Sequence, residues 1–215
     1  MSSEVTREER TFLQKAEYSE ALRKILRAIG DTPKSVYAPS DDSYLMLDAI
    51  AKLSVEGKTM LDVGTGAGVL GLYCATRGTR VTVTDVDESA LQQALKAAHS
   101  LRLSLQPVLS DLFSKVRGEF DFVLFNPPYL PSSTLEDRTV DGGRGGTALS
   151  KRFLEGLPRH LKRDGKALLL VSSLNDTASL LGGYLEFQFS VMAIRPLFFE
   201  ELQVLCVRFR DDLAS

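Results

Sequence analysis

Residues 59–68 read Thr-Met-Leu-Asp-Val-Gly-Thr-Gly-Ala-Gly, a short apolar run that passes directly into a glycine-rich turn. The apolar part predicts a buried strand, and a helical stretch at residues 68–77 follows the turn. Glycines at this point let the backbone turn sharply and approach a ligand, because no Cβ stands in the way. A strand, a glycine turn and a helix in this order indicate a nucleotide-binding α/β unit.

Strands and helices continue to alternate along the chain. Further strand-like runs lie at residues 80–84, 106–109, 120–125 and 166–171, and helical stretches at 88–101 and 148–161. This alternation implies right-handed crossovers and a parallel sheet that is buried on both faces. After a helix near residues 176–183, runs at 186–194 and 201–208 follow without a helix between them and should pair antiparallel. We expect an α/β fold with a Rossmann-like, seven-stranded, mostly parallel sheet, an antiparallel last strand and helices on both faces.

Two helices precede the predicted sheet. Residues 6–9 have a capping-box pattern, and apolar residues recur at helical spacing from there until Gly30. A second helix should begin at residues 40–42, which carry oxygen-bearing side chains. We divide the chain into an amino-terminal helical extension, residues 1–35, and one domain, residues 36–215. We expect the extension to pack on the domain.

Composition excludes several classes of protein. The 215 residues are 44% hydrophobic, enough for one buried core, and 26 basic against 28 acidic residues leave a net charge of −2 without a dense basic run. This balance disfavours autonomous binding of nucleic acid. No apolar run approaches the roughly 20 residues that cross a bilayer, and no signal peptide is recognisable, so we expect a cytoplasmic protein with no membrane contact. Cys74 and Cys206 lie in apolar surroundings typical of reduced buried thiols, and we expect no metal site.

The spacing of the glycines favours one class of cofactor. A dinucleotide fingerprint places its third glycine three residues after the second, but Val69 stands there, and the glycines are Gly64, Gly66 and Gly68. The pattern therefore favours S-adenosylmethionine over NAD. A plain structural explanation stays open for the turn alone, because tight packing of a helix on a strand also requires small residues.

Acidic residues stand at the ends of the first three predicted strands. Asp85 follows the first glycine by 21 positions and could accept both ribose hydroxyl groups, or it could cap the next helix, a role that Asp87 could fill instead. Asp111, with Leu112 beside it, is either a contact for the adenine amino group or a surface turn residue. Asp62 either orients the glycine turn or meets the methionine ammonium group. Because ligands bind at the carboxyl ends of parallel strands, the three acids together predict a cofactor site.

The motif Asn126-Pro127-Pro128-Tyr129 follows the predicted central strand. Prolines fix the backbone and donate no hydrogen bond, so the Asn126 side chain and the Pro127 carbonyl are held as acceptors for the two hydrogens of an NH2 group. Accepting these hydrogens increases electron density on a poorly nucleophilic amide nitrogen and aims its lone pair. Tyr129 could stack on a planar group, and Asn126 would also border the cofactor. The motif therefore predicts catalysis of N-methylation.

Three alternatives remain for this motif. It could be only a tight turn after a strand, or part of a protein that keeps the fold without catalysis. As an enzyme, it could act on an exocyclic amine of adenine or guanine in RNA or DNA, which offers the same planar NH2 group. The charge balance and the lack of an appended nucleic-acid module count against the last alternative.

With these residues in place, the chain resembles the HemK family of glutamine methyltransferases that modify translation release factors, and especially its short archaeal and eukaryal branch. The likeness is carried by the Asn-Pro-Pro-Tyr motif and by residues 36–43, 141–146, 152–154 and 198–202. It implies an S-adenosylmethionine-dependent protein-glutamine N-methyltransferase whose substrate is the Gly-Gly-Gln motif of a release factor, with Asn126 and Pro127 binding the amide. It also implies a small zinc-binding activator subunit as a partner. Ala38 departs from the acidic residue that is usual at its position. A second departure is the stretch of about 30 residues before the opening motif, where short members have few; it should pack on the domain, and the alternative is that it helps to dock the substrate protein.

Overall fold

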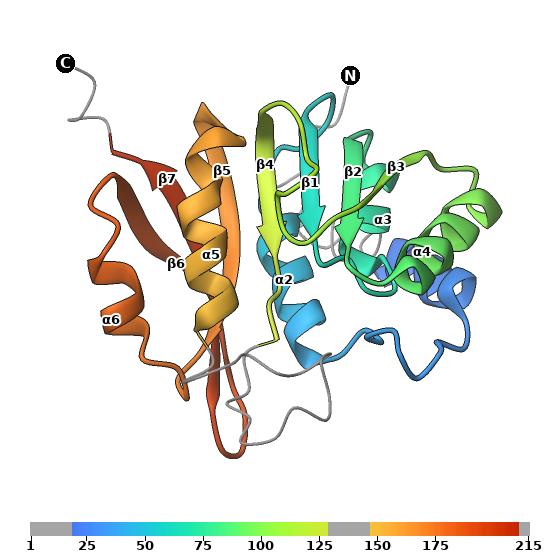
Figure 1. Ribbon diagram of the computed structural model, residues 1–215. Helices are drawn as coiled ribbons and strands as arrows, with labels where there is room; N and C mark the ends of the chain where they lie inside the picture. Colours follow the sequence, from blue (N-terminus) through green and yellow to red (C-terminus); the bar gives the residue numbers. More distant parts are fainter. Residues whose placement is uncertain (1–18, 129–146, 211–215) are drawn as a thin grey trace, which may run out of the picture.

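The structure, a computed structural model, describes residues 19–128 and 147–210 (Figure 1). A helix covers residues 19–29. The remaining helices are α2 (Asp41–Ala51), α3 (Val69–Thr76), α4 (Glu88–Ser100), α5 (Ala148–Gly156), the 3-10 helix η2 (Leu157–Arg159) and α6 (Thr177–Gly182). The strands are β1 (Thr59–Val63), β2 (Arg80–Asp85), β3 (Leu105–Leu109), β4 (Phe120–Phe125), β5 (Leu161–Ser172), β6 (Phe187–Pro196) and β7 (Glu201–Phe209). Tyr129, the predicted capping box at residues 6–9 and the motif at 141–146 lie outside the described residues.

The seven strands form one sheet in the order β3-β2-β1-β4-β5-β7-β6. The first five strands of the chain pair in parallel, and β7 runs antiparallel to both of its neighbours, β5 and β6. This arrangement confirms the predicted Rossmann-like fold with its antiparallel last strand. The hairpin of β6 and β7 forms without a helical crossover, because a tight turn can join antiparallel strands.

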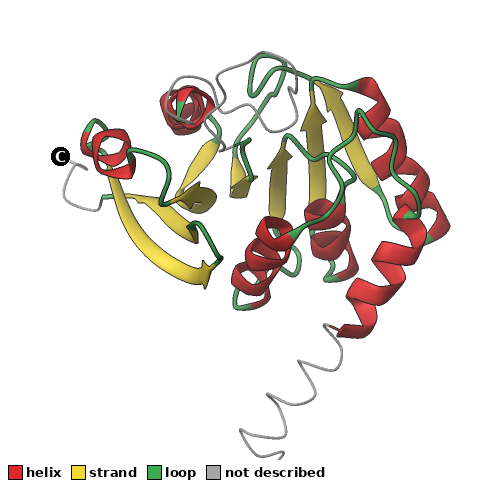
Figure 2. Ribbon diagram, turned by 90° about the horizontal axis from the view of Figure 1, so that it is seen from below, coloured by secondary structure: helices red, strands yellow, loops and turns green. Residues whose placement is uncertain are grey.

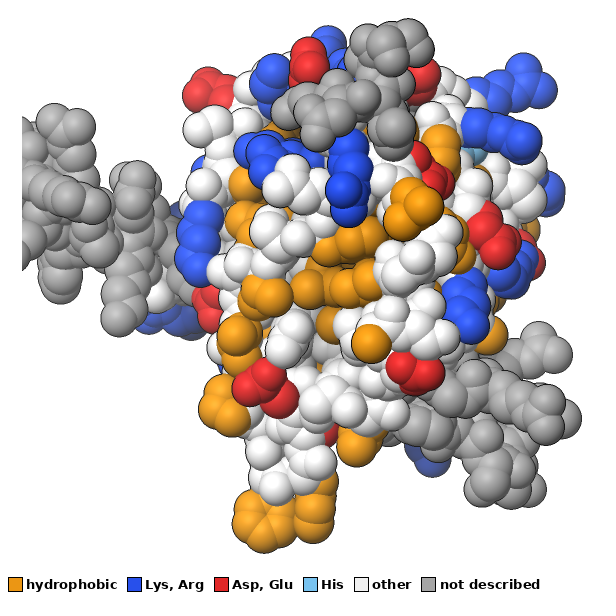
Figure 3. Space-filling view, turned by 90° about the vertical axis from the view of Figure 1, so that its left-hand side faces the viewer, with side chains coloured by type: hydrophobic (Ala, Val, Ile, Leu, Met, Phe, Trp, Pro, Cys, Tyr) orange, Lys and Arg blue, Asp and Glu red, His pale blue; other side chains and the backbone are white. Residues whose placement is uncertain are grey.

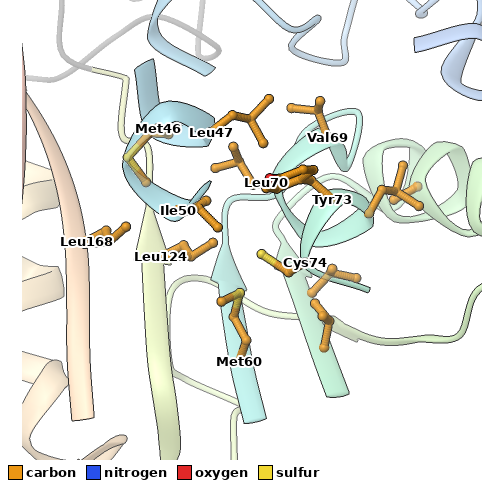
Figure 4. Packing of buried hydrophobic residues seen from close by; sticks show 14 of the residues in the cluster. Met46, Leu47, Ile50, Met60, Val69, Leu70, Tyr73, Cys74, Leu124 and Leu168 are labelled. Carbon is orange, nitrogen blue, oxygen red and sulfur yellow. The ribbon is translucent and has the colours of Figure 1, made fainter. Parts of the chain in front are cut away.

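Helices cover both faces of the sheet, which therefore has two buried sides (Figure 2). On β1, Met60 belongs to the core cluster under α2, α3 and α4, whereas Leu61 belongs to the cluster under α5 and α6. Neighbouring residues of a strand point to opposite faces, so an unbroken apolar strand is what this architecture requires. Figure 4 shows the first cluster, with Ile50 of α2 beside Leu124 of β4.

The helix at residues 19–29 shares the core of the domain. Ile25 and Ile29 are buried in the same cluster as α2, α3 and α4. The Nε2 group of Gln93, on α4, donates a hydrogen bond to the carbonyl of Ile29 at 2.5 Å. This part of the extension therefore packs on the domain through its apolar face.

Helix α5 is shorter than the predicted helix at residues 148–161, and strand β5 starts before the predicted residue 166. Helix α5 ends at Gly156, and Pro158 stands at the start of the 3-10 turn, where its missing N–H interrupts the α-helical hydrogen bonds. Strand β5 begins at Leu161, and its pairing with β4 shifts register between Phe120 and Phe122. The first part of β5 contains polar residues, so it has no apolar run that would predict a strand.

Two predictions from the composition concern the cysteines and membrane-spanning segments. Cys74 and Cys206 are both buried and free, as predicted. Within the two described ranges, no helix is both long and apolar enough to cross a membrane.

Candidate functional site

The candidate site lies at the carboxyl edge of the sheet, where the parallel strands β1, β2 and β4 end (lower side in Figure 1). Val63, the last residue of β1, stands opposite Thr84 on β2 and Phe125 on β4. The residues that follow these three, Gly64, Asp85 and Asn126, therefore meet at one edge. This is where sheets of this kind bind their ligands.

Two glycines of the turn meet neighbouring segments at close range. Gly66 has φ +52°, and a Cβ there would lie 3.0 Å from the carbonyl oxygen of Tyr37. Gly68 has φ +87° and begins α3, and its Cβ would lie 2.6 Å from the Cβ of Ala94 on α4. Residues other than glycine are strained at such backbone angles because they carry a Cβ. The structural explanation thus holds for both glycines, because residue 37 and α4 pack closely against the turn.

Asp62 holds the glycine turn against the start of α3. Its Oδ2 atom accepts hydrogen bonds from Thr65 Oγ1 at 2.7 Å and from the amide of Gly71 at 3.1 Å. The side chain is buried, and burial raises its pKa from 3.8 to about 7. This arrangement corresponds to the loop-orienting alternative for Asp62.

Asp85 is linked to the glycine turn by its carboxylate. One oxygen accepts a hydrogen bond from the amide of Gly66 and the other from the amide of Asp87, both at 3.0 Å. Asp87 itself is the N-cap of α4, where it accepts from the amide of Ser89 at 2.8 Å. The capping alternative for Asp85 is therefore wrong. Burial raises the pKa of Asp85, although backbone hydrogen bonds from Asp87, Gly66 and Val86 act in the opposite direction.

Asp111 and Leu112 lie beyond the end of β3. Asp111 is exposed and forms an ion pair with Arg152 of α5 at 2.8 Å, a contact that the sequence did not predict. Leu112 is half-buried and has φ +46°, an uncommon angle for a residue with a side chain. Val86, directly after Asp85, is 68% exposed beside the same edge. Its position after the candidate ribose carboxylate was the signal that could have identified it as part of the site.

Asn126 has the clearest sign of an unmet interaction. Its Oδ1 atom is buried and has no hydrogen-bond partner within the described parts of the chain. Leaving a buried acceptor unpaired costs about 1–3 kcal/mol, so such atoms usually await a donor. Pro127 is buried and Pro128 is half-buried next to it, and neither can supply an N–H group. A donor from outside the chain fits this position.

The segment at residues 36–43 folds across the glycine turn. The carbonyl of Tyr37 accepts a hydrogen bond from the amide of Ala67 at 3.1 Å. The Tyr37 hydroxyl donates to Oδ2 of Asp42 at 2.6 Å, and Asp42 also accepts from the Ser43 hydroxyl at 3.1 Å. Sequence analysis had marked this segment only as a family likeness, and Tyr37 was not among its candidate site residues.

Taken as a set, these residues fit S-adenosylmethionine. Asp85 offers a carboxylate beside the glycine turn, Val86 and Leu112 offer apolar surface, and Asn126 offers an acceptor that no described residue pairs with. A nucleoside carrying a polar amino-acid tail needs this combination of partners.

A family model and a similar protein both indicate a methyltransferase. The Methyltransferase small domain family matches residues 40–193. A protein of Methanocaldococcus jannaschii named "Putative protein N5-glutamine methyltransferase" is 35% identical over 181 residues, which cover 79% of this chain and 90% of that protein.

Solved structures agree on the fold. The E. cuniculi Mtq2-Trm112 complex, which is responsible for methylation of the eRF1 translation termination factor, has a TM-score of 0.69 at 26% identity, covering 82% of this chain and 99% of that chain. A T. thermophilus 16S rRNA N2 methyltransferase, solved with AdoMet and guanosine, has a TM-score of 0.65 at 22% identity, covering 80% of this chain and 44% of that chain. The chain therefore belongs to the methyltransferase small domain family, and within it to the HemK family of short archaeal and eukaryal type, as an S-adenosylmethionine-dependent methyltransferase.

Proposed function

We propose that this chain methylates the side-chain amide nitrogen of the glutamine in the Gly-Gly-Gln motif of a translation termination factor. The observation that carries the proposal is the buried Oδ1 atom of Asn126 at the carboxyl end of β4, which has no hydrogen-bond partner among residues 19–128 and 147–210. The names of the M. jannaschii and E. cuniculi proteins support the choice of a protein glutamine as the acceptor.

In this proposal, Asn126 and the Pro127 carbonyl accept the two hydrogens of the substrate amide. The nitrogen of an amide is a poor nucleophile because its lone pair is delocalised into the carbonyl. Two acceptors increase its electron density, stabilise the positive charge that develops on it and fix its direction. No general base is needed, because the nitrogen can lose its proton after the transfer. Tyr129 would stack on the planar amide, although it lies outside the described residues.

The remaining site residues would hold the cofactor. S-adenosylmethionine, when bound, supplies an electrophilic methyl group on a sulfonium sulfur. Asp85 would accept the ribose hydroxyl groups with its carboxylate, which backbone hydrogen bonds from Gly66 and Asp87 hold beside the glycine turn. Asp111 and Leu112 would meet the adenine ring, with Val86 as added apolar surface. The turn from Gly64 to Gly68 would take the amino-acid tail, with Asp62 fixing its shape.

We also propose the division of the chain and its partner. Residues 36–215 would form the catalytic domain and residues 1–35 an extension that packs on it. A small zinc-binding activator subunit would assemble with the chain. The Mtq2-Trm112 complex supports the existence of a partner, whereas zinc binding by that partner rests on the family resemblance alone. A cytoplasmic location follows from the proposed substrate.

The test is methyl transfer from labelled S-adenosylmethionine to four acceptors. These are the organism's release factor, the same factor with the motif glutamine changed to alanine, its rRNA and its DNA. We expect label on the first acceptor and none on the second. Label on nucleic acid with none on either form of the factor would overturn the proposal in favour of an exocyclic amine.

A further inference from the structure

The tip of the β6–β7 hairpin carries two aromatic residues in place of the usual turn residues. Phe198 and Phe199 are 91% and 85% exposed, and their rings meet edge to face with centroids 4.5 Å apart. The amide of Leu197 donates to the carbonyl of Glu200 at 2.7 Å, so the two aromatic residues form a two-residue tip. Glycine, asparagine and aspartate dominate such positions, since they suit the backbone and face water. A break with both local turn chemistry and burial preference is typical of a functional surface.

The tip of this hairpin is joined to the edge of the sheet that carries the candidate site. The hydroxyl of Ser172, the last residue of β5, donates to Oε2 of Glu200 at 2.5 Å. Strand β5 lies beside β4, with Leu169 opposite Phe125, the residue before Asn126. The tip therefore lies at the carboxyl edge of the sheet, where it is the lowest point of Figure 1. Figure 3 shows an apolar projection at the same lower end of the molecule.

A second set of contacts holds the hairpin from the side of α2. Arg195, near the end of β6, donates to the Asp41 carbonyl at 3.0 Å and forms ion pairs with the carboxylates of Asp41 and Asp48, each at 3.1 Å. Asp41 is the first residue of α2 and belongs to the segment that crosses the glycine turn. The hairpin near the aromatic tip thus contacts Ser172 of β5 on one side and α2 on the other.

We propose that Phe198 and Phe199 dock on an apolar surface of the protein substrate, beside the loop that carries the target glutamine. This inference rests on the proposed function, because it assumes a protein as the methyl acceptor. Two aromatic side chains bury roughly 300–500 Å² together, which suits an anchor in a transient enzyme–substrate contact. A stable dimer needs about 800 Å² from each partner, so the tip alone is too small for self-association.

Charge near the tip selects a protein over a nucleic acid. Glu200 and Glu201 directly follow the aromatic pair, and carboxylates repel a phosphate backbone. The nearest cation of the hairpin, Arg195, is already paired with two carboxylates of α2. Stacking on an unpaired base would therefore lack the basic support that single-stranded binding surfaces provide.

The experiment compares one variant on two substrates. The double substitution Phe198→Ala, Phe199→Ala is assayed with the full-length release factor and with a short peptide that contains the Gly-Gly-Gln motif and a few flanking residues. We expect kcat/KM for the full-length factor to fall about 10- to 100-fold, mainly through KM, with no change for the peptide or in cofactor affinity. The matched control is Leu185→Ala, an apolar residue that is 72% exposed in the turn before β6, at the opposite end of the hairpin.

Any other outcome would contradict either the docking proposal or the proposed function. Equal losses on factor and peptide would assign the phenylalanines to the chemistry or to folding, and unchanged methylation of the factor would remove them from docking. A wild-type dimer that the double variant converts to a monomer would assign the tip to self-association. If the wild-type chain does not methylate the factor at all, the proposed function fails first and docking falls with it. Phe198→Leu, Phe199→Leu should recover part of the lost kcat/KM, since an apolar contact is restored.

Discussion

The substitution Asn126→Ala is expected to slow methyl transfer about 10²- to 10³-fold while leaving the unliganded protein as stable as the wild type, or more stable. The Oδ1 atom of Asn126 is buried without a partner among the described residues, so the folded wild type bears its desolvation cost until a donor binds. Alanine removes the acceptor and the cost together. Most substitutions at buried positions have the opposite effect on stability.

The substitution is expected to leave the free energy of unfolding unchanged or raise it, and to lower kcat. An unpaired buried acceptor costs about 1–3 kcal/mol, and the packing lost from a half-buried amide offsets roughly 1 kcal/mol of the relief. The free energy of unfolding should therefore rise by about 0–2 kcal/mol. Loss of one preorganised polar group at a reacting centre typically lowers kcat by about 10²- to 10³-fold.

Urea unfolding of the unliganded proteins and single-turnover methyl transfer measure these two effects. A matched control is Asn175→Ala, because the Oδ1 atom of Asn175 does accept a hydrogen bond, from the amide of Ser172 at 3.1 Å. This control should lose about 1 kcal/mol of stability. The reasoning is refuted if Asn126→Ala unfolds more easily than the wild type by over about 1 kcal/mol, or if it turns over at the wild-type rate.

Three further predictions concern the cofactor edge. Asp85→Ala should raise the dissociation constant for S-adenosylmethionine about tenfold or more in calorimetric titration, because a charged acceptor is lost, and unchanged affinity would contradict the ribose role. Burial raises the pKa of Asp62 from 3.8 to about 7, so between about pH 4 and 7 the folded chain holds a proton that the unfolded chain has released. The contribution of Asp62 to stability should therefore fall as the pH rises through this window and level off above it, and Asp62→Asn should remove this slope from denaturation curves recorded across the range. Gly68→Ala should cost roughly 2–4 kcal/mol in thermal unfolding, from a left-handed angle and from the close approach of Ala94, whereas Gly57→Ala, at φ +70° with nothing within 4 Å, should cost about 1–2 kcal/mol. Equal costs for the two glycine variants would contradict the packing explanation.

Strand β4 shows why part of the fold could be predicted. Residues 120–125 form an apolar run that only Asp121 interrupts, and Asn126 and two prolines follow it; the structure has the strand at those residues. The start of β5 could not be found in this way. Lys162, Arg163 and Asp164 interrupt its apolar pattern, and Leu161 is recognised as strand only by pairing with Phe120 across a register shift.

Some features of the candidate site could likewise be predicted from the sequence, and others could not. Glycine and proline restrict or free the backbone by their own covalent structure, so the turn after β1 and the stop after β4 can be recognised without knowledge of any contact. The assignment of the helix cap was different. Asp85 and Asp87 are both suitable N-cap residues in sequence, and only the hydrogen bond from Ser89 to Asp87 distinguished them.

The sequence by itself thus determined the order of strands and helices, the glycine turn and the Asn-Pro-Pro stop, because each depends on residues that are neighbours in the chain. Only the tertiary structure decided that Asn126 has an acceptor unpaired among the described residues, that Tyr37 lies on the turn at Gly66, and that the aromatic tip at residues 198–199 belongs to the same edge. The physical reason is chain separation. Burial and hydrogen-bond partners arise from segments far apart in sequence, and which segments meet is fixed by strand register and crossovers, which no local pattern encodes.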